Sequence, residues 1–252
     1  MLKTIFVDGD KGGVGKTMVA RAIADAYIQR TNGLPDCKLI CLDADHTNPD
    51  FCGPGGFEPD SGVHETGLIN LDESKSWLEL VNSLEPFIEM AHQEEVRIIV
   101  SMPATAKRAF EKGSEEVAQI MSMLNAIPVW VIGRTEDSVT QLQKRYHAMP
   151  RQFEHGLAVI NLFFGNRDRF VIWDRSETRK DLIGSGDWKE AGLPEMSDLV
   201  VAKLGRTPYH RAIATGIGSN GIKLGMGDII GVRAFSSRAG TAVSVVEQIG
   251  GK

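Results

Sequence analysis

The chain has 252 residues, of which 42% are hydrophobic and 24% are charged, an ordinary composition for a globular protein. Its 33 acidic and 28 basic residues give a formal net charge of −5, so contact with a nucleic acid would need a local basic patch. The length suits one large α/β domain with a buried core, and we expect a single domain over residues 1–252.

The cysteine content and the apolar runs bear on where the protein works. Three cysteines, an odd and small number, favour a reducing compartment without a disulfide framework. The sequence has no run of eighteen apolar residues, which predicts no membrane-spanning helix. Lys3 is followed by a short strand-like run and not by the long apolar segment of a signal peptide. We therefore expect a cytoplasmic protein with no membrane partner.

The first predicted elements are a strand over Lys3–Asp8 and a helix over Lys16–Arg30, joined by a glycine-rich loop. The strand is an apolar run, and the helix places its apolar residues on one face. A strand, a glycine loop and a helix in this order are the context that makes a phosphate-binding loop credible.

The loop reads KGGVGKT over residues 11–17. Its glycines allow successive backbone N–H groups to point at one anion, and the start of the helix adds a positive end. Lys16 supplies a mobile charge for the β- and γ-phosphates, and Thr17 supplies a hydroxyl for Mg²⁺. A turn that binds nothing is the alternative, but six specified residue types at this spacing arise by chance with a probability on the order of 10⁻⁴. The candidate nucleotide-binding residues here are Lys11, Gly12, Gly13, Val14, Gly15, Lys16, Thr17 and Met18.

Apolar runs alternate with helix-period segments along the rest of the chain. The predicted strands are nearly continuous apolar runs, as in a parallel sheet covered on both faces; they are Leu39–Asp43, Arg97–Met102, Val129–Gly133, Leu157–Asn161 and Leu199–Leu204, with Phe170–Trp173 as a further short strand. The predicted helices are Ser74–Glu94, with a kink or restart at Pro86, then Glu111–Asn125, Glu136–Met149 and Ser236–Ile249. This alternation predicts an α/β fold with a doubly wound, mostly parallel sheet flanked by helices.

Two acids close the second predicted strand, at the edge where strands of such folds meet their ligand. Asp43 and Asp45 are two residues apart, so strand alternation points both side chains the same way. An ATPase needs acids of this kind to hold the Mg²⁺ shell and to position the attacking water. Two solvated acids at a strand end are the alternative. The following stretch, His46–Asn70, is rich in glycine and proline, which is typical of a nucleotide-sensing switch or of a surface insertion.

The loop departs from the ordinary GxxxxGK[ST] pattern, because Asp10 replaces the first glycine and Lys11 is an additional lysine. In this it resembles the deviant Walker A loop of the ParA/MinD family of P-loop ATPases. The resemblance implies ATP and Mg²⁺ as ligands and a slow ATPase activity that a partner stimulates. It also implies an ATP-dependent homodimer in which Lys11 reaches the nucleotide of the partner subunit.

The same resemblance assigns roles to further residues. Asp43 and Asp45 would face the γ-phosphate and Mg²⁺. Ser101 holds the position of the family's Walker B aspartate, and a serine brings no charge. This implies weak Mg²⁺ binding, slow hydrolysis, or a role for Asp43 in place of the missing aspartate. Asn161 holds the position of an asparagine that recognises adenine in the family; the alternative is an ordinary asparagine in a turn. Gly205–Tyr209, after the last predicted strand, holds the position of the family's segment that surrounds the base. The candidate catalytic residues are therefore Lys11, Asp43 and Asp45, and the candidate Mg²⁺ ligands are Thr17, Asp43 and Ser101.

A narrower resemblance concerns the segments Asp43–Asp50 and Phe170–Arg179, which look like plasmid stability and mobilisation ATPases of the StbB/MobD type. It implies an ATP-driven dimerisation switch in plasmid partition, stability or conjugative transfer, with DNA or a DNA-bound adaptor protein as the partner. Basic residues at the density found here usually form a solvated face; the candidates for DNA contact are Lys107, Arg108, Lys112, Arg206, His210, Arg211 and Lys223.

Two other classes of protein share the expected fold. Membrane-recruited positioning needs a basic amphipathic C-terminal helix, and Gly240–Lys252 has one basic residue, so we reject that function. The alternative that stays open is an NTP-dependent metal-cofactor chaperone or a small-molecule ligase. Such chaperones typically carry paired interface cysteines, and Cys37, Cys41 and Cys52 form no obvious pair.

Overall fold

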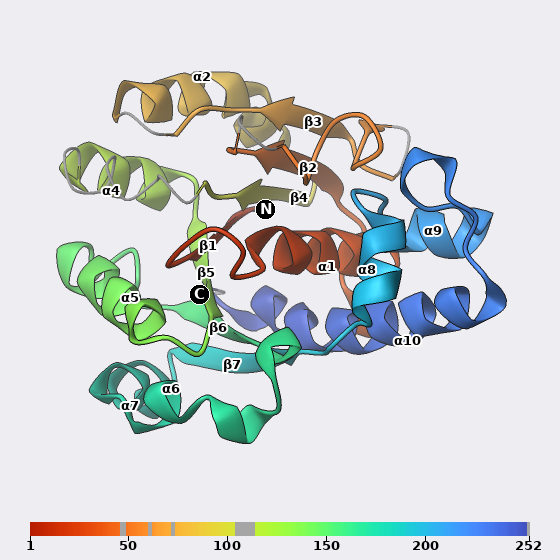
Figure 1. Ribbon diagram of the computed structural model, residues 1–252. Helices are drawn as coiled ribbons and strands as arrows, with labels where there is room; N and C mark the ends of the chain where they lie inside the picture. The colour runs from red at the N-terminus through yellow and green to blue at the C-terminus, as the bar shows by residue number, and fades with distance from the viewer. Residues whose placement is uncertain (46–48, 60–61, 72–73, 104–113, 251–252) are drawn as a thin grey trace.

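The computed structural model describes residues 1–45, 49–59, 62–71, 74–103 and 114–250. Seven strands form one sheet in the order β3-β2-β4-β1-β5-β6-β7, and every pairing is parallel. The sheet runs from β3 at the top of Figure 1 to β7 at the bottom. The strands are β1 Leu2–Gly9, β2 Lys38–Asp43, β3 Glu65–Leu68, β4 Val96–Ser101, β5 Ala126–Ile132, β6 Gly156–Asn161 and β7 Trp188–Leu193.

Helices cover both faces of the sheet (Figure 1). One face carries α1 Lys16–Ile28, α8 Asp198–Leu204, α9 Tyr209–Thr215 and α10 Met226–Val243; the other carries α2 Ser74–Met90, α4 Ser114–Met123, α5 Glu136–Ala148, α6 Val171–Arg175 and α7 Glu177–Gly184. Short 3₁₀ helices are η1 Thr31–Gly33, η3 Leu162–Phe164, η4 Arg167–Arg169, η5 Ser219–Gly221 and η6 Ser244–Gln248. The predicted doubly wound α/β fold is confirmed.

The central strand β1 shows why the strands read as apolar runs. Ile5 and Val7 belong to the core on the α1 face, and Phe6 belongs to the core on the α2 face. Because successive side chains of a strand point to opposite faces, a strand with helices on both sides has to be apolar throughout. Because all seven strands are parallel, their carboxyl ends lie at one edge of the sheet, where the candidate site lies.

The prediction of a last strand at Leu199–Leu204 is wrong, because this segment is helix α8. Val200 and Leu204, four residues apart, are buried, whereas Leu199 is 74% exposed, which is the pattern of one helical face and not of a strand. The true last strand is β7, where only the end residues Trp188 and Leu193 are buried. As an edge strand, β7 lacks the apolar run that is typical of the central strands.

Phe170–Trp173 is not a strand either. Phe170 and Trp173 are buried three residues apart, while Val171 and Ile172 between them are more than 40% exposed, and the segment forms the start of α6. Three further differences occur where the hydrophobic pattern of the sequence is weak. Strand β3 lies within the predicted loop His46–Asn70, and helices α7 and α9 were not predicted. Helix α10 begins ten residues before the predicted Ser236. Glycines at three positions inside α10 hide its helical pattern.

Most of the predicted helices are confirmed, with shifted ends. Helix α2 continues through Pro86 without a break and ends at Met90. Residues 111–113 of the predicted helix Glu111–Asn125 lie outside the described residues. Among the described residues, no helix has the length and apolar character needed to cross a bilayer.

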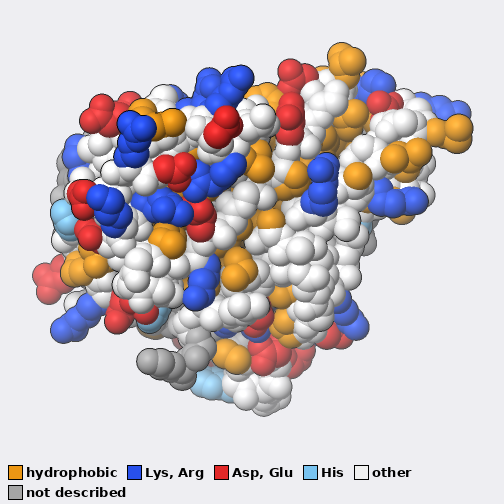
Figure 2. Space-filling view, turned by 90° about the horizontal axis from the view of Figure 1, so that it is seen from below, with side chains coloured by type: hydrophobic (Ala, Val, Ile, Leu, Met, Phe, Trp, Pro, Cys, Tyr) orange, Lys and Arg blue, Asp and Glu red, His pale blue; other side chains and the backbone are white. Residues whose placement is uncertain are grey.

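The C-terminal part of the chain differs in charge from the rest. Residues 199–252 hold seven of the 28 basic residues and only two of the 33 acidic ones. Figure 2 shows one face from below: acidic and basic side chains are interspersed on its left, and hydrophobic side chains gather near the right end, the end at which α10 begins in Figure 1. A single uniformly basic surface is therefore not seen on this face.

Candidate nucleotide-binding site

The glycine-rich loop joins β1 to α1 at the carboxyl edge of the sheet. Gly13 and Gly15 have φ angles of 77° and 104°, in the left-handed region that favours glycine. At Gly15, a Cβ atom would lie 2.3 Å from the side-chain nitrogen of Asn161, so any larger residue would collide there. At Gly12 and Gly13, a Cβ atom would meet nothing within 4 Å, which leaves room above the loop for a phosphate group.

Lys16 is the first residue of α1 and is 8% exposed. Its ammonium Nζ donates a hydrogen bond to the carbonyl oxygen of Lys11 across the loop, at 2.9 Å. Burial lowers the pKa of Lys16, and the neighbouring carboxylates of Asp8, Asp10 and Asp45 oppose that shift. The lysine is therefore held over the loop among acids that partly offset the effect of its burial.

Asn161, at the end of β6, supports the loop from below. Its Nδ2 donates to the carbonyl oxygen of Val14 at 2.8 Å, and its Oδ1 accepts from the backbone N–H of Phe163 at 3.1 Å. The side chain is 1% exposed. Both ends of the amide are thus engaged with the backbone in this geometry, and the expected reading of adenine stays a prediction.

Asp43 and Ser101 lie side by side at the carboxyl edge. The register pairs Asp43 of β2 with Ser101 of β4, and Ser101 with Val7 of β1. Both side chains are buried, at 1% and 3% exposure. Strand alternation turns them toward the α1 face, because Val7, in the same row, belongs to the α1-face core. The predicted Asp43 and Ser101 are thereby brought together beside the strand that carries the glycine loop.

The carboxylate of Asp43 organises the chain that follows β2. One oxygen accepts from the backbone N–H of Asp45 at 3.0 Å and the other from that of Phe51 at 2.7 Å. Burial raises the pKa of Asp43, and these N–H groups partly offset the rise. Asp45 is partly exposed. Asp43 therefore fixes the loop after β2, and Asp45 is the more accessible of the two acids.

Hydrogen bonds and an ion pair connect the loop after β2 to α1 and to the segment between α8 and α9. Arg21, 7% exposed on α1, donates to the carbonyl oxygens of Asp50 and Gly205, and Arg206 pairs with the Asp50 carboxylate at 2.9 Å. The expectation that Gly205–Tyr209 follows the last strand is therefore corrected. Because β7 ends at Leu193, the position after the last strand belongs to residues 194–197.

Several candidates for DNA contact have partners within the chain. His210 lies 2.5 Å from Asp25, Arg206 pairs with Asp50, and Arg211 donates to the carbonyl oxygen of Gly56 at 2.8 Å and lies 3.4 Å from Glu58. Lys223 is exposed. The other three candidates, Lys107, Arg108 and Lys112, lie outside the described residues.

Sequence reasoning missed Asp8 and Arg145. Asp8 lies one residue before the end of β1 and is 7% exposed; Arg145 of α5 lies 3.5 Å from its carboxylate. Burial raises the pKa of Asp8, opposed first by Arg145. An acid that directly follows the apolar residues Ile5, Phe6 and Val7 of the central strand is the signal that could have identified it, since a buried charge requires compensation.

The arrangement fits Mg²⁺ bound together with a nucleotide. The described residues contain no group of three or more His, Cys, Asp and Glu side chains able to hold a metal ion by themselves. Mg²⁺ is commonly held by one or two protein oxygens together with substrate phosphates. The hydroxyl of Thr17 and the adjacent side chains of Asp43 and Ser101 are the residues that could serve in this way.

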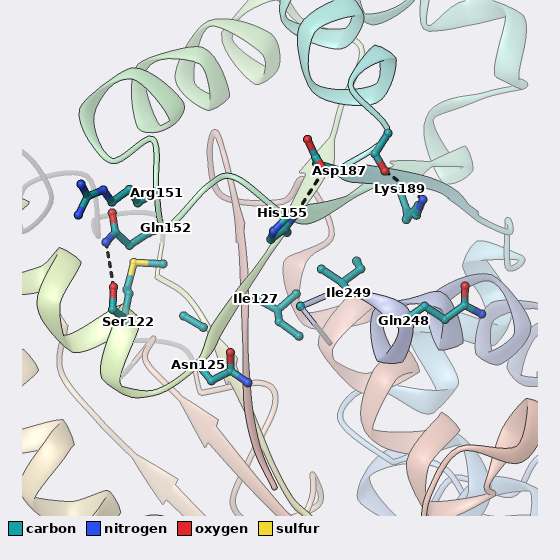
Figure 3. Close-up of a pocket in the computed structure, with 14 residues that line it drawn as sticks. Ser122, Asn125, Ile127, Arg151, Gln152, His155, Asp187, Lys189, Gln248 and Ile249 are labelled. Atoms are coloured by element: carbon teal, nitrogen blue, oxygen red, sulfur yellow. Dashed lines mark hydrogen bonds and ion pairs between the residues drawn. The ribbon is translucent and has the colours of Figure 1, made fainter. Parts of the chain in front are cut away.

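A separate cavity of about 460 Å³ lies at the opposite edge of the sheet, where β5, β6 and β7 begin (Figure 3). Ile127 and Ile249 form part of its wall, and His155 lies beside Asp187 there, with their side chains 3.7 Å apart. None of the predicted site residues lines it. It is therefore distinct from the candidate nucleotide-binding site.

Fold and site together define a doubly wound α/β protein whose first strand and helix are joined by a P-loop sequence. No protein-family model matches the chain. It is 28% identical over 203 residues to "Protein MobD" of Acidithiobacillus ferrooxidans, covering 79% of this chain and 81% of that protein. This relative bears out the MobD part of the resemblance, whereas the ParA/MinD subtype stays a prediction.

Two solved structures are also similar. One is a nucleotide-binding protein in complex with ADP from Archaeoglobus fulgidus, with 16% identity, a TM-score of 0.43, and coverage of 82% of this chain and 88% of that chain. The other is FtsY from Mycoplasma mycoides, with 9% identity, a TM-score of 0.41, and coverage of 95% and 68%. The fold assignment rests on the sheet order and the helical layers.

Proposed function

We propose that the chain binds and hydrolyses ATP with Mg²⁺ and acts as a nucleotide-dependent dimerisation switch. The observation that carries the proposal is the glycine loop, in which Gly13 and Gly15 adopt left-handed conformations and the Lys16 ammonium is held across the loop at the Lys11 carbonyl. This geometry suits a phosphate group, because the N-terminal end of α1 and the lysine both favour an anion at one point.

Each residue of the site has its own role in this proposal. Lys16 exchanges its bond to the Lys11 carbonyl for charge-assisted bonds to the β- and γ-phosphates. Mg²⁺, when bound, neutralises phosphate charge, and the Thr17 hydroxyl with Asp43 and Ser101 would hold its shell. Asp45 is partly exposed and close enough to Lys16 to act on its pKa, which supports the role we propose for it, the orientation of the attacking water. Since Ser101 brings no charge, we expect slow turnover.

The dimer and the biological role rest on the two resemblances. Lys11 is exposed, as a residue that contacts the nucleotide of a second copy has to be. The similarity to protein MobD supports a role in plasmid mobilisation, partition or stability, with DNA or a DNA-bound adaptor as the partner. The alternative of a metal-cofactor chaperone gains no support from Cys41 and Cys52, which are buried and have raised pKa values.

Nucleotide binding by the Lys16→Ala variant tests the proposal. Charge-assisted bonds contribute roughly 1.5–3 kcal/mol each, so ATP affinity should fall at least about tenfold, as measured by calorimetry with Mg²⁺. Lys223→Ala, which removes an exposed lysine near α10, serves as the matched control and should bind ATP as the original chain does. Equal ATP affinities for Lys16→Ala and the original chain would refute the P-loop assignment.

A further inference from the structure

A second cavity, of about 470 Å³, adjoins the glycine loop on its β5 and β6 side. Three cationic side chains from three different segments line it: Lys11 from the loop, Arg134 from the connection between β5 and α5, and Arg169 from η4. Neither Lys16 nor Thr17, on which the proposed ATP site depends, lines this cavity. It is therefore a neighbouring space and not the phosphate cradle itself.

The charges around this cavity are not balanced from within. Among the described residues, no acidic side chain lines it. Within the described parts of the chain, the side chains of Lys11, Arg134 and Arg169 make no hydrogen bond or ion pair. Like charges that converge on a cleft focus a positive potential and attract an anion. Asp10, a nearby acid, is held by the hydroxyls of Thr135 at 3.3 Å and Ser138 at 3.4 Å.

The other residues that line the cavity are Val14, Gly133, Phe164 and the polar Thr135. Val14 forms one side and the Phe164 ring another, while Gly133 keeps the space open. The volume lies within the range of small-molecule pockets, roughly 300–1,000 Å³, and exceeds what a single phosphate fills. Arginines beside an aromatic ring are the combination that binds a nucleotide, because the ring packs against the base and the cations hold the phosphate.

We propose that this cavity binds a second nucleotide unit beside the ATP of the glycine loop, with Arg134 and Arg169 on its phosphate and Phe164 against its base. The unit is either a free nucleoside monophosphate or one nucleotide of a single strand. Because Lys11 belongs to both the loop and the cavity, occupancy of the cavity acts on the lysine that borders the ATP site. This site goes beyond the proposed ATPase activity, since it does not use Lys16.

Binding of two probes tests the inference, with the glycine loop saturated by AMPPNP and Mg²⁺. The probes are AMP, followed by calorimetry, and a fluorescent twelve-residue oligothymidylate, followed by anisotropy. The test variant is Arg134→Gln/Arg169→Gln, and the matched control is Arg175→Gln/Arg238→Gln, which removes two exposed arginines elsewhere. We expect one probe to bind the original chain and the control, and to bind the test variant at least about tenfold more weakly. AMP alone would identify a free nucleotide, and the oligonucleotide would identify a strand.

Three results would overturn the inference: neither probe binds, the test variant binds the probe as the control does, or the test variant loses AMPPNP by the same factor. The last result would assign the cavity to the ATP site. Lys16→Ala separates this proposal from the proposed function. If the second site is real, Lys16→Ala no longer binds AMPPNP but still binds the probe. If Lys16→Ala still binds AMPPNP, the P-loop assignment is wrong, and the arginine variants alone then decide whether the cavity binds a nucleotide.

Discussion

Replacing Asn161 by leucine tests how the glycine loop is held. The leucine side chain is similar in size but leaves the carbonyl oxygen of Val14 and the N–H of Phe163 without the partners they have at 2.8 and 3.1 Å. A buried polar group without a partner costs roughly 1–3 kcal/mol, so two such groups should lower the free energy of unfolding by about 2–6 kcal/mol. Urea denaturation followed by circular dichroism measures this change.

The same variant separates two roles of Asn161. If the amide only supports the loop, ATP and GTP affinities should fall by the same factor, about tenfold, since fixing even one loop residue costs about 1–2 kcal/mol. If the amide reads adenine, ATP affinity falls and GTP affinity does not. Asn166→Leu, at an exposed asparagine five residues away, is the control. Unfolding energies that agree within about 0.5 kcal/mol between Asn161→Leu and this control would refute the loop-support argument.

Three further predictions concern other parts of the molecule. Glu247→Ala removes the carboxylate that Arg97, 1% exposed, holds at 2.6 Å; it should cost about 3 kcal/mol in urea unfolding, the lower end of the range for a broken buried pair, because Glu95 remains 2.7 Å from Arg97. Burial raises the pKa of the Cys37 thiol from 9.0 to about 11. Alkylation at pH 8, which needs the thiolate, should therefore be about a hundredfold slower in the folded chain than in urea. The contribution of the buried neutral thiol to the free energy of unfolding is complete below about pH 9 and is lost as the pH rises toward 11. Ser101→Asp should raise Mg²⁺ affinity in the presence of ATP, because a carboxylate binds the ion more strongly than a hydroxyl; unchanged Mg²⁺ titrations would deny Ser101 a place beside the metal.

The nucleotide loop and the central strands could be predicted because their signals are local. KGGVGKT predicts the turn between the strand and the helix that flank it, all within residues 2–28, and the central strands are mostly apolar because both faces are covered. The last strand could not be predicted, since β7 at the sheet edge has only two buried side chains, Trp188 and Leu193. The apolar run in α8, which faces the core on one side only, was therefore mistaken for it.

The contacts that hold the site together depend on residues far apart in the sequence. Asn161 lies 147 residues from the Val14 carbonyl that it binds, and Arg21 is fastened to Gly205 across 184 residues. Nothing in the local pattern around either residue signals its partner. Sequence reasoning could place Asn161 at a strand end, but only the fold shows that its amide faces the loop. For the same reason the pairing of Asp8 with Arg145 could not be predicted.

The central claim is that ATP joins two copies of the chain through Lys11. Multi-angle light scattering after gel filtration, with and without ATP and Mg²⁺, measures this directly on the original chain and on Lys11→Ala. We expect the original chain to double its mass with ATP, and Lys11→Ala to bind ATP by calorimetry yet stay at 27.5 kDa. A Lys11→Ala variant that forms the dimer with ATP and hydrolyses it at the original rate would contradict the account.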